Sequence, residues 1–237
     1  MDVGCRERIE QVLAGAEAAG RTQLLESEVY TLLREIGVAT PRFDVLPIDG
    51  SDEEWQAAVA GLIDEPVPQG IVLKIQSPDI LHKTEAGGIA FVSPEAEAIV
   101  PEARALLERV REKAPSARLE GLLVCEKVPY QSGLPGNEML LSLRQDLTLG
   151  PAIVLGIGGL LTEWYGKLAP GETTWILSAL DPIFTSEARP DFAGRSPAFA
   201  LLFGTSRLHE TLPPFDPSVF WEMLRSWADL ALSLIHI

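Results

Sequence analysis

Apolar residues recur at helical spacing in five segments of the chain. The helices that this spacing predicts are residues 6–19, 26–36, 52–63, 94–113 and 217–230. Gly20 and Gly37 follow the first two segments, where a helix-terminating residue is expected. Pro101 lies inside the fourth segment and predicts a kink or a later start.

Short apolar runs between these helices predict strands. The runs are residues 38–48, 70–76, 119–126, 138–144 and 152–159. Residues 166–215 are rich in Pro, Gly, Ser and Thr, so few elements are expected there. Strands alternate with helices in the first half and pair as hairpin-like runs later. We therefore predict an α+β (mixed α/β) fold in two lobes, with the boundary near Glu126.

Composition favours a globular protein without a membrane-spanning segment. The chain has 237 residues, of which 46% are hydrophobic, enough for a substantial core. No apolar run is long enough to span a membrane, and the first ten residues lack a signal-peptide pattern, so we expect a cytoplasmic protein without a membrane partner. Cys5 and Cys125 show neither metal-ligand spacing nor a disulfide framework, which favours packing or surface roles in a reducing compartment.

The net charge limits the possible partners. A formal charge of −15 argues against nucleic acid, because binding through phosphate backbones needs clustered Lys and Arg. A small anion can still be bound in an acidic protein where a few basic side chains meet.

One charged residue interrupts the apolar run at 70–76. Lys74 stands between Leu73 and Ile75, and an unpaired ammonium group is costly to remove from water. We therefore expect an anionic group opposite Lys74. A solvent-facing lysine on an edge strand is the alternative that period-two alternation permits.

The residues after this run carry further candidate chemistry. Gly87 and Gly88 would let a turn approach phosphate oxygens closely, although adjacent glycines also form ordinary tight turns. His82, beside Lys83, has the chemistry of a nucleophile or proton carrier near neutral pH, or it is an ordinary loop histidine.

Glu126 ends the apolar run at 119–126, where a connection rich in Pro and Gly begins. Its carboxylate and the neighbouring backbone could face the edge of an adenine. The alternative is a solvated carboxylate at a strand end.

Three segments together resemble the ATP-grasp domain of the ADP-forming acyl-CoA synthetases, the acetate–CoA ligase family, which is distantly related to the succinyl-CoA synthetase β subunit. They are VLKIQSPDILHKTEAGGIAF (72–91), LEGLLVCEKVP (119–129) and NEMLLSLRQDLTLGPAIVLGIGGLLTE (137–163). The first is the specific one, because it combines a lysine, Ser-Pro-Asp, His-Lys and Gly-Gly at these spacings. The resemblance implies an ATP-grasp fold with a nucleotide cleft between two lobes. The implied parts are an N-terminal helix (1–21), an N-terminal lobe (22–125) and an incomplete C-terminal lobe (126–231).

The resemblance also implies a role for the motif in residues 72–91. Lys74 would contact the α and β phosphates of ATP or ADP, and the Gly87-Gly88 turn would lie over them. In these synthetases phosphate passes between an acyl phosphate, an enzyme histidine and ADP. His82 would therefore be the catalytic phosphate acceptor, and Lys83 would support its charge.

Adenine and ribose contacts are implied further along the chain. Glu126 and the Val128 backbone would hold adenine, and Glu138 would reach the ribose hydroxyls. The implied reaction converts acyl-CoA, ADP and phosphate to a carboxylic acid, CoA and ATP. It would use Mg and a CoA-binding α-like subunit or domain as partner.

The chain departs from the family pattern in its second half. The connection from Glu126 to Glu138 is longer than usual, and Ile176 stands where relatives carry an arginine that Lys167 or Arg189 would have to replace. The expected metal-binding motif is absent, so the metal ligands are unknown and we expect the chain to be inactive in isolation.

The end of the chain has an unusual sequence. Residues 232–237, LSLIHI, match what the string CTG-TCT-CTT-ATA-CAC-ATC encodes, and this string resembles a transposon-end adapter of sequencing libraries. We interpret them as a non-native tail. The alternative is a genuine short apolar tail.

Two other functions remain open at this point. One is a catalytically impaired regulatory ATP-grasp module, which the Ile176 departure motivates. The other is a different ATP-grasp carboxylate ligase, in which the histidine motif would have no purpose.

Overall fold

A computed structural model of the chain describes residues 3–129, 138–158, 166–167, 171, 173–186, 190–191, 194 and 217–234. The chain divides into two compact units, one spanning Asp2–Pro129 and the other containing Tyr130–Ile237. This division falls four residues after the predicted lobe boundary at 125/126. Each unit is described by itself below.

The first unit is built around a four-stranded antiparallel sheet with the strand order β1-β4-β2-β3. Its strands are β1 (Phe43–Leu46), β2 (Ile71–Gln76), β3 (Ile89–Val92) and β4 (Gly121–Glu126). Lys74 of β2 lies opposite Leu123 of β4 on one side and Ile89 of β3 on the other. Because β2 is an inner strand, the explanation of Lys74 as an edge-strand lysine is wrong.

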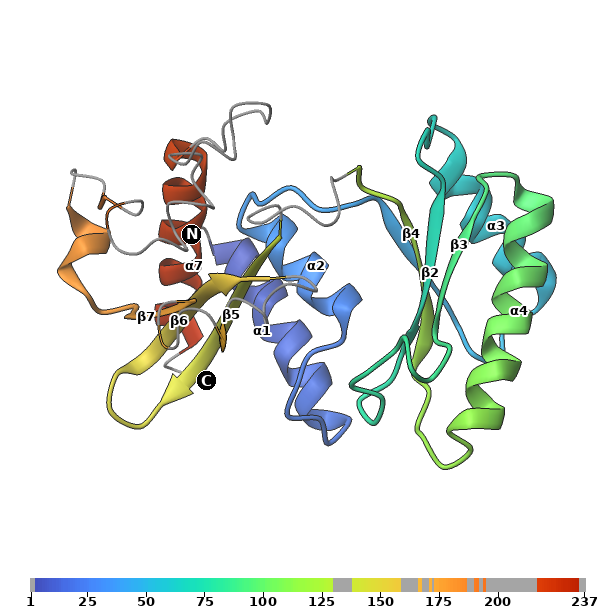
Figure 1. The fold of residues 1–237 in the computed structure, drawn as a ribbon, viewed down its shortest axis with the longest axis horizontal. Helices are drawn as coiled ribbons and strands as arrows, with labels where there is room; N and C mark the ends of the chain where they lie inside the picture. Colours follow the sequence, from blue (N-terminus) through green and yellow to red (C-terminus); the bar gives the residue numbers. More distant parts are fainter. Residues whose placement is uncertain are drawn as a thin grey trace. The chain divides into compact units, whose positions relative to one another are not determined.

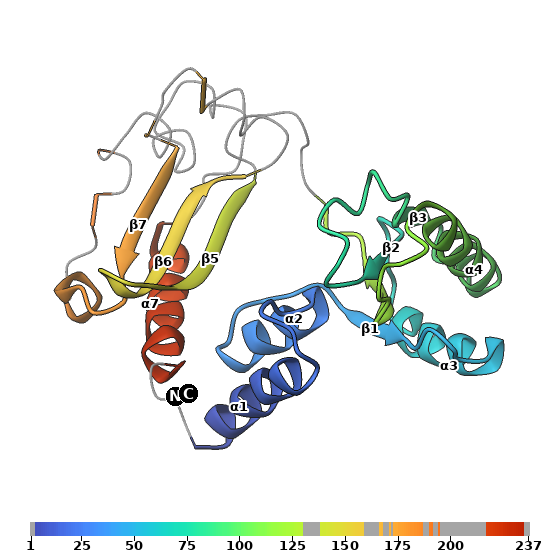
Figure 2. The same ribbon diagram turned by 90° about the horizontal axis from the view of Figure 1, so that it is seen from below.

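Helices lie on both sides of this sheet, two on each side. The helices are α1 (Val3–Ala18), α2 (Glu26–Glu35), α3 (Asp52–Ile63) and α4 (Ala96–Lys113). Figure 1 and Figure 2 show α3 and α4 on one face of the sheet and α1 and α2 on the other. Helix α4 begins at Ala96, two residues after the predicted start, and continues through Pro101.

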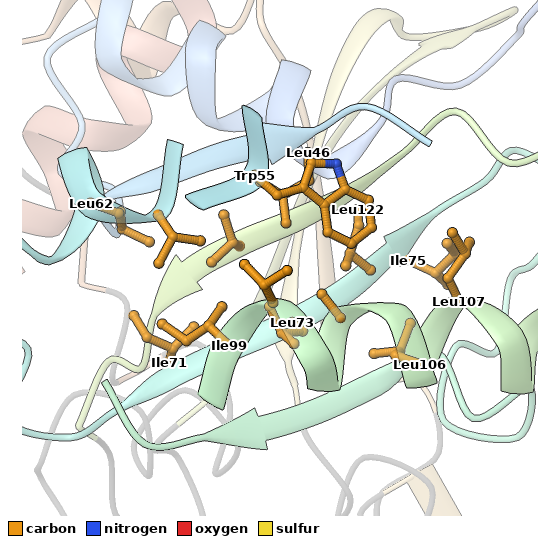
Figure 3. Packing of buried hydrophobic residues seen from close by; sticks show 14 of the residues in the cluster. Leu46, Trp55, Leu62, Ile71, Leu73, Ile75, Ile99, Leu106, Leu107 and Leu122 are labelled. Carbon is orange, nitrogen blue, oxygen red and sulfur yellow. The ribbon is translucent and has the colours of Figure 1, made fainter. Parts of the chain in front are cut away.

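The main core lies between the sheet and α3 with α4. Alternate residues of β2, namely Ile71, Leu73 and Ile75, point into it and are fully buried (Figure 3). Trp55 of α3 is also fully buried, and its indole N–H donates a hydrogen bond of 2.9 Å to the Pro47 carbonyl. The period-two pattern of β2 therefore places its other residues, including Lys74, on the face that carries α2.

The α2 face of the sheet has a smaller apolar cluster. Val72, Leu123 and Cys125 are buried there, and Tyr30 and Phe43 pack against them with ring centroids 5.3 Å apart. Cys5 and Cys125 are both buried and neither forms a disulfide, as the sequence predicted.

The second unit contains a three-stranded antiparallel sheet in the order β5-β6-β7. Its elements are β5 (Met139–Asp146), β6 (Gly150–Ile157), β7 (Thr174–Ser178), a 3-10 helix η1 (Pro182–Thr185) and α7 (Pro217–Leu234). Helix α7 packs on β6, and Trp221 stacks on Phe184 with ring centroids 5.5 Å apart.

The sequence pattern did not reveal β7. This strand has only five residues and lies in a segment rich in turn-forming residues, so its alternation is too short to recognise; pairing with β6 selects the extended conformation. Helix α7 extends to Leu234, so three residues of the suspected tail at 232–237 are helical, and residues 235–237 lie outside the described part. Among the helices described, none is long and apolar enough to cross a membrane.

Candidate functional site

Lys74 has an anionic partner, as its place in an apolar strand predicted. Its Nζ lies 2.5 Å from Oε1 of Glu26, the first residue of α2. About a fifth of each side chain is exposed (23% for Lys74 and 20% for Glu26), so the pair is largely shielded from water. Sequence reasoning missed Glu26, because it lies 48 residues from Lys74 and looks like an ordinary acidic residue in a first helical turn.

A second lysine and a tyrosine meet the same carboxylate. Lys83 Nζ lies 3.2 Å from Glu26 Oε2, and the Tyr30 hydroxyl donates a hydrogen bond of 2.8 Å to Glu26 Oε1. We call these four residues, Glu26, Tyr30, Lys74 and Lys83, the Glu26 cluster. Two ammonium groups and one carboxylate give the cluster a formal charge of +1, so it attracts an anion although the whole chain is acidic.

The cluster keeps its carboxylate ionised. Burial opposes ionisation of Glu26, but the charge and hydrogen bond of Lys74, the Tyr30 hydroxyl and the charge of Lys83 outweigh it. The pKa of Glu26 is therefore lowered from its ordinary value. Burial and the neighbouring carboxylate raise the pKa of Tyr30, so its hydroxyl remains a hydrogen-bond donor.

Gln76 connects β2 to the start of α2. It is 2% exposed, and its Oε1 accepts a hydrogen bond of 3.0 Å from the Ser27 backbone N–H. Gln76 lies two residues beyond Lys74 on the same face of the strand. One strand therefore supplies both the lysine and the side chain that fixes the helix carrying its counter-ion.

The loop from β2 to β3 carries the His-Lys and Gly-Gly motifs. His82 is exposed, and Lys83 is partly buried against the Glu26 cluster. The Gly87 amide donates to the Thr84 carbonyl at 3.0 Å, and the Gly88 amide to the Lys83 carbonyl at 2.7 Å. Both amides are thus used inside the turn, and their predicted approach to phosphate stays a prediction.

The two glycines are needed for different reasons. Gly87 adopts a φ of 70°, in the left-handed region that side chains disfavour. A Cβ on Gly88 would overlap the Cγ2 methyl of Ile75 and would also crowd the Lys83 carbonyl oxygen. This pair therefore packs the turn against β2 and holds it beside Lys74.

The carboxylate of Glu126 is held by Arg42. Glu126 Oε1 accepts the Arg42 backbone N–H at 2.9 Å, and Oε2 accepts Arg42 Nε at 3.0 Å. Partial burial opposes ionisation of Glu126, but these hydrogen bonds and the Arg42 charge outweigh it and lower the pKa of Glu126. The carboxylate is therefore not a freely solvated strand end, and its predicted contact with adenine stays a prediction. Val128, two residues further on, is half exposed.

Within the first unit, the structure brings together some of the predicted residues and separates others. Lys74 and Lys83 meet at Glu26. Glu126 lies opposite Ile71, three rungs along the sheet from the Lys74 position, or about 10 Å along the strand. Glu138 belongs to the second unit, where its carbonyl accepts the Gly158 amide at 2.9 Å just before β5.

The position of the expected arginine is occupied by Ile176, as the sequence indicated. Ile176 lies on β7 opposite Val154 and is 41% exposed. Lys167 is exposed, and Arg189 lies outside the described residues. No group of three or more His, Cys, Asp or Glu side chains suited to a metal ion occurs in the part of the chain that is described.

The family follows from comparison with known proteins. A family model described as an ATP-grasp domain matches residues 15–205, which is most of the chain. The chain therefore belongs to the ATP-grasp family, and the predicted fold class is confirmed.

Relatives lie among the ADP-forming acetate–CoA ligases, which confirms the predicted resemblance. The β subunit of acetate–CoA ligase (ADP-forming) I from Pyrococcus furiosus is 30% identical over 156 residues, covering 66% of this chain and 61% of that subunit. The corresponding subunit of ligase II is 28% identical over 155 residues, covering 65% and 58%. Acetate–CoA ligase (ADP-forming) I from Archaeoglobus fulgidus is 33% identical over 159 residues, covering 67% of this chain and 21% of that protein. The chain thus spans about three-fifths of the length of the Pyrococcus subunits.

Solved structures agree with this assignment. Acetyl-coenzyme A synthetase 1 of Ca. Korarchaeum cryptofilum, in complex with coenzyme A, Ca-AMPCP and HgCl+, has a TM-score of 0.69 at 25% identity, covering 94% of this chain and 86% of that one. The same enzyme with coenzyme A, acetyl-coenzyme A and a phosphorylated phosphohistidine segment has a TM-score of 0.68 at 25% identity, with the same coverage.

Proposed function

We propose that this chain is the nucleotide-binding ATP-grasp component of an acid–CoA ligase (ADP-forming). The full enzyme would convert acyl-CoA, ADP and phosphate to a carboxylic acid, CoA and ATP, or run the reverse reaction. A CoA-binding partner subunit or domain would complete it. Support comes from the relatives, which are ADP-forming ligases, and from a related structure that contains the nucleotide analogue AMPCP with calcium.

The Glu26 cluster is the observation that carries this proposal. It holds two ammonium groups on an inner strand and the loop that follows, with a formal charge of +1 in a chain of net charge −15. Phosphate oxygens are the ligands that such a local cationic site favours. Lys74 would contact the α and β phosphates, and Lys83 would lie beside the reacting histidine.

His82 is the proposed phosphate acceptor. Its imidazole nitrogen would attack a phosphoryl group carried by the partner, forming one N–P bond as the donor bond breaks. An oxygen of the ADP β phosphate would then take the group, and the N–P bond of His82 would break to release ATP. Exposure of His82 leaves its imidazole accessible for both transfers. Bound magnesium would neutralise phosphate charge in these transfers.

Adenine and ribose would be held elsewhere in the chain. The Arg42 contacts to Glu126 favour a refined assignment in which the backbone from Glu126 to Val128, rather than the Glu126 carboxylate, meets the adenine edge. Glu138 remains the proposed ribose contact.

Labelling of His82 tests the proposed reaction. The full-length protein with its CoA-binding partner would be incubated with Mg and ATP labelled in the γ phosphate. We expect an acid-labile, alkali-stable label on His82 that His82→Asn abolishes. His209→Asn is the matched control and should keep the label. Equal labelling of wild type and His82→Asn would refute the histidine role.

A regulatory nucleotide-binding module is the second candidate, because half-exposed Ile176 stands where relatives have an arginine. The labelling experiment, with ADP binding measured on the same samples, separates the two. A regulatory module would bind ADP but leave His82 unlabelled even with the partner present.

A further inference from the structure

We infer that Glu26 is a positioning residue of the nucleotide site, whose carboxylate holds the ammonium groups of Lys74 and Lys83 together so that both face one phosphate-binding position. This inference deepens the proposed function and rests on it. It concerns a residue that is remote in sequence from the motif in residues 72–91.

The carboxylate is shared between the two lysines. Each oxygen accepts from one ammonium group, Oε1 from Lys74 at 2.5 Å and Oε2 from Lys83 at 3.2 Å. Without a carboxylate between them, two ammonium groups this close would repel each other. Glu26 offsets that repulsion and fixes the direction of both side chains.

Both lysines retain donors for a phosphate group. An ammonium group has three N–H donors, and Glu26 takes one from each lysine. Among the described residues, the ammonium groups of Lys74 and Lys83 have no other hydrogen-bond partner. Two donors on each side chain thus remain for phosphate oxygens, and the cluster keeps its charge of +1.

Glu26 itself is held in place from both sides along the chain. The Ser27 amide is bound by buried Gln76 at 3.0 Å, and the Leu25 amide donates to Glu28 Oε2 at 2.7 Å. Glu28 is in turn fixed by Arg21, with N···O distances of 2.5 and 2.6 Å. A carboxylate anchored in this way is a fixed support for the lysines rather than a mobile surface group.

The arrangement follows a known physical logic. Protein kinases hold the strand lysine that contacts ATP phosphates with a glutamate from a helix, and the ion pair must be formed for phosphoryl transfer. Here Gln76 binds the start of α2, which fixes the position of Glu26. The Glu26 carboxylate in turn fixes the ammonium groups of the two lysines. The fold is different from that of a kinase, so the comparison concerns the ion pair alone.

The test compares ADP with adenosine, which lacks phosphate. Binding of each ligand, with Mg present, would be measured by calorimetric titration for the wild-type chain, Glu26→Gln and Glu26→Asp. We expect Glu26→Gln to weaken ADP binding about tenfold or more while adenosine binding changes less than about twofold. Glu26→Asp should recover part of the ADP affinity, since it restores the negative charge.

A control variant removes an exposed ion pair elsewhere in the same unit. Glu10→Gln breaks the exposed pair between Arg6 and Glu10, and it should leave both affinities unchanged. Circular dichroism would establish that each variant is folded. If Glu26→Gln does not fold, Glu26→Asp supplies a milder change at the same position.

The outcomes separate the inference from the proposed function. A wild-type chain that binds no ADP would overturn the proposed function, and the inference with it. A wild-type chain that binds ADP, together with a folded Glu26→Gln variant that binds it equally well or better, would overturn the inference alone. Equal weakening of ADP and adenosine would also overturn it, because it would indicate a general structural role.

Discussion

Replacing Gly88 by alanine should destabilise the first unit, although the change adds only one methyl group. The new Cβ would overlap the Cγ2 methyl of Ile75 and lie 3.2 Å from the Lys83 carbonyl oxygen. Gly88 cannot move away easily, because its amide donates to Lys83 and its carbonyl accepts the Ile75 amide at 2.8 Å. Overpacking typically costs about 1 to 3 kcal/mol, and this rigid, β-branched neighbour places the expected cost at about 3 kcal/mol.

Urea unfolding followed by thiol labelling measures this cost in the correct unit. Cys5 and Cys125 are both buried and both lie in the first unit, so their labelling by a thiol reagent reports on that unit alone. A loss of about 3 kcal/mol corresponds to a clear fall in the urea midpoint. Circular dichroism of the same samples would follow the whole chain.

Two further variants decide whether the methyl overlap is the cause. Gly61→Ala is the matched control, because Gly61 is an exposed residue of α3 whose added Cβ would meet no atom within 4 Å, and it should stabilise the unit by about 0.5 to 1 kcal/mol. Ile75→Ala removes the clashing Cγ2, so Gly88→Ala should cost much less in that background. A cost below about 1 kcal/mol in the wild-type background, or an unchanged cost in the Ile75→Ala background, would refute this reasoning.

Two other predictions concern titratable groups in the first unit. Because Arg42 lowers the pKa of Glu126 in the folded chain, the stabilisation from this carboxylate is complete above the ordinary pKa of 4.5 and is lost as the pH falls below it. The urea midpoint of Glu126→Gln should therefore fall less steeply than that of the wild type between about pH 5 and about pH 3, and parallel curves would contradict this. Burial raises the pKa of the Cys125 thiol to about 11, so iodoacetamide should modify Cys125 far more slowly in the folded chain than in urea near neutral pH; mass spectrometry of the modified peptide measures this, and equal rates would exclude the predicted burial.

Local patterns in the sequence predicted most helices and strands of the first unit. The run 52–63 has acidic residues in its first turn and one apolar face, and α3 has those bounds. The apolar run around Lys74 predicted β2, and its alternation explains why Ile71, Leu73 and Ile75 enter the core. Local signals were sufficient there because each of these elements is long enough to show a full hydrophobic repeat of its own.

The partners of the candidate site residues were not predictable in the same way. The sequence predicted an anionic partner for Lys74 but not which residue supplies it. Glu26 contacts Lys74 because Gln76 holds α2 against β2, which brings together residues 48 positions apart. In the same way, Glu126 is bound by Arg42 across 84 positions, a partner that its location at a strand end did not indicate. A single sequence carries no periodic signal for such contacts, since they depend on the order of strands in the sheet.

Titration of ADP into the chain tests the central claim most directly. With Mg present, calorimetry would compare the wild type with Lys74→Ala and with Arg111→Ala, which removes the same charge from an exposed position on α4. If the Glu26 cluster binds nucleotide phosphate, the wild type and Arg111→Ala should bind ADP alike, and Lys74→Ala should bind it at least about tenfold more weakly. Equal affinity of all three for ADP, or no binding by the folded wild type, would contradict the assignment of this site.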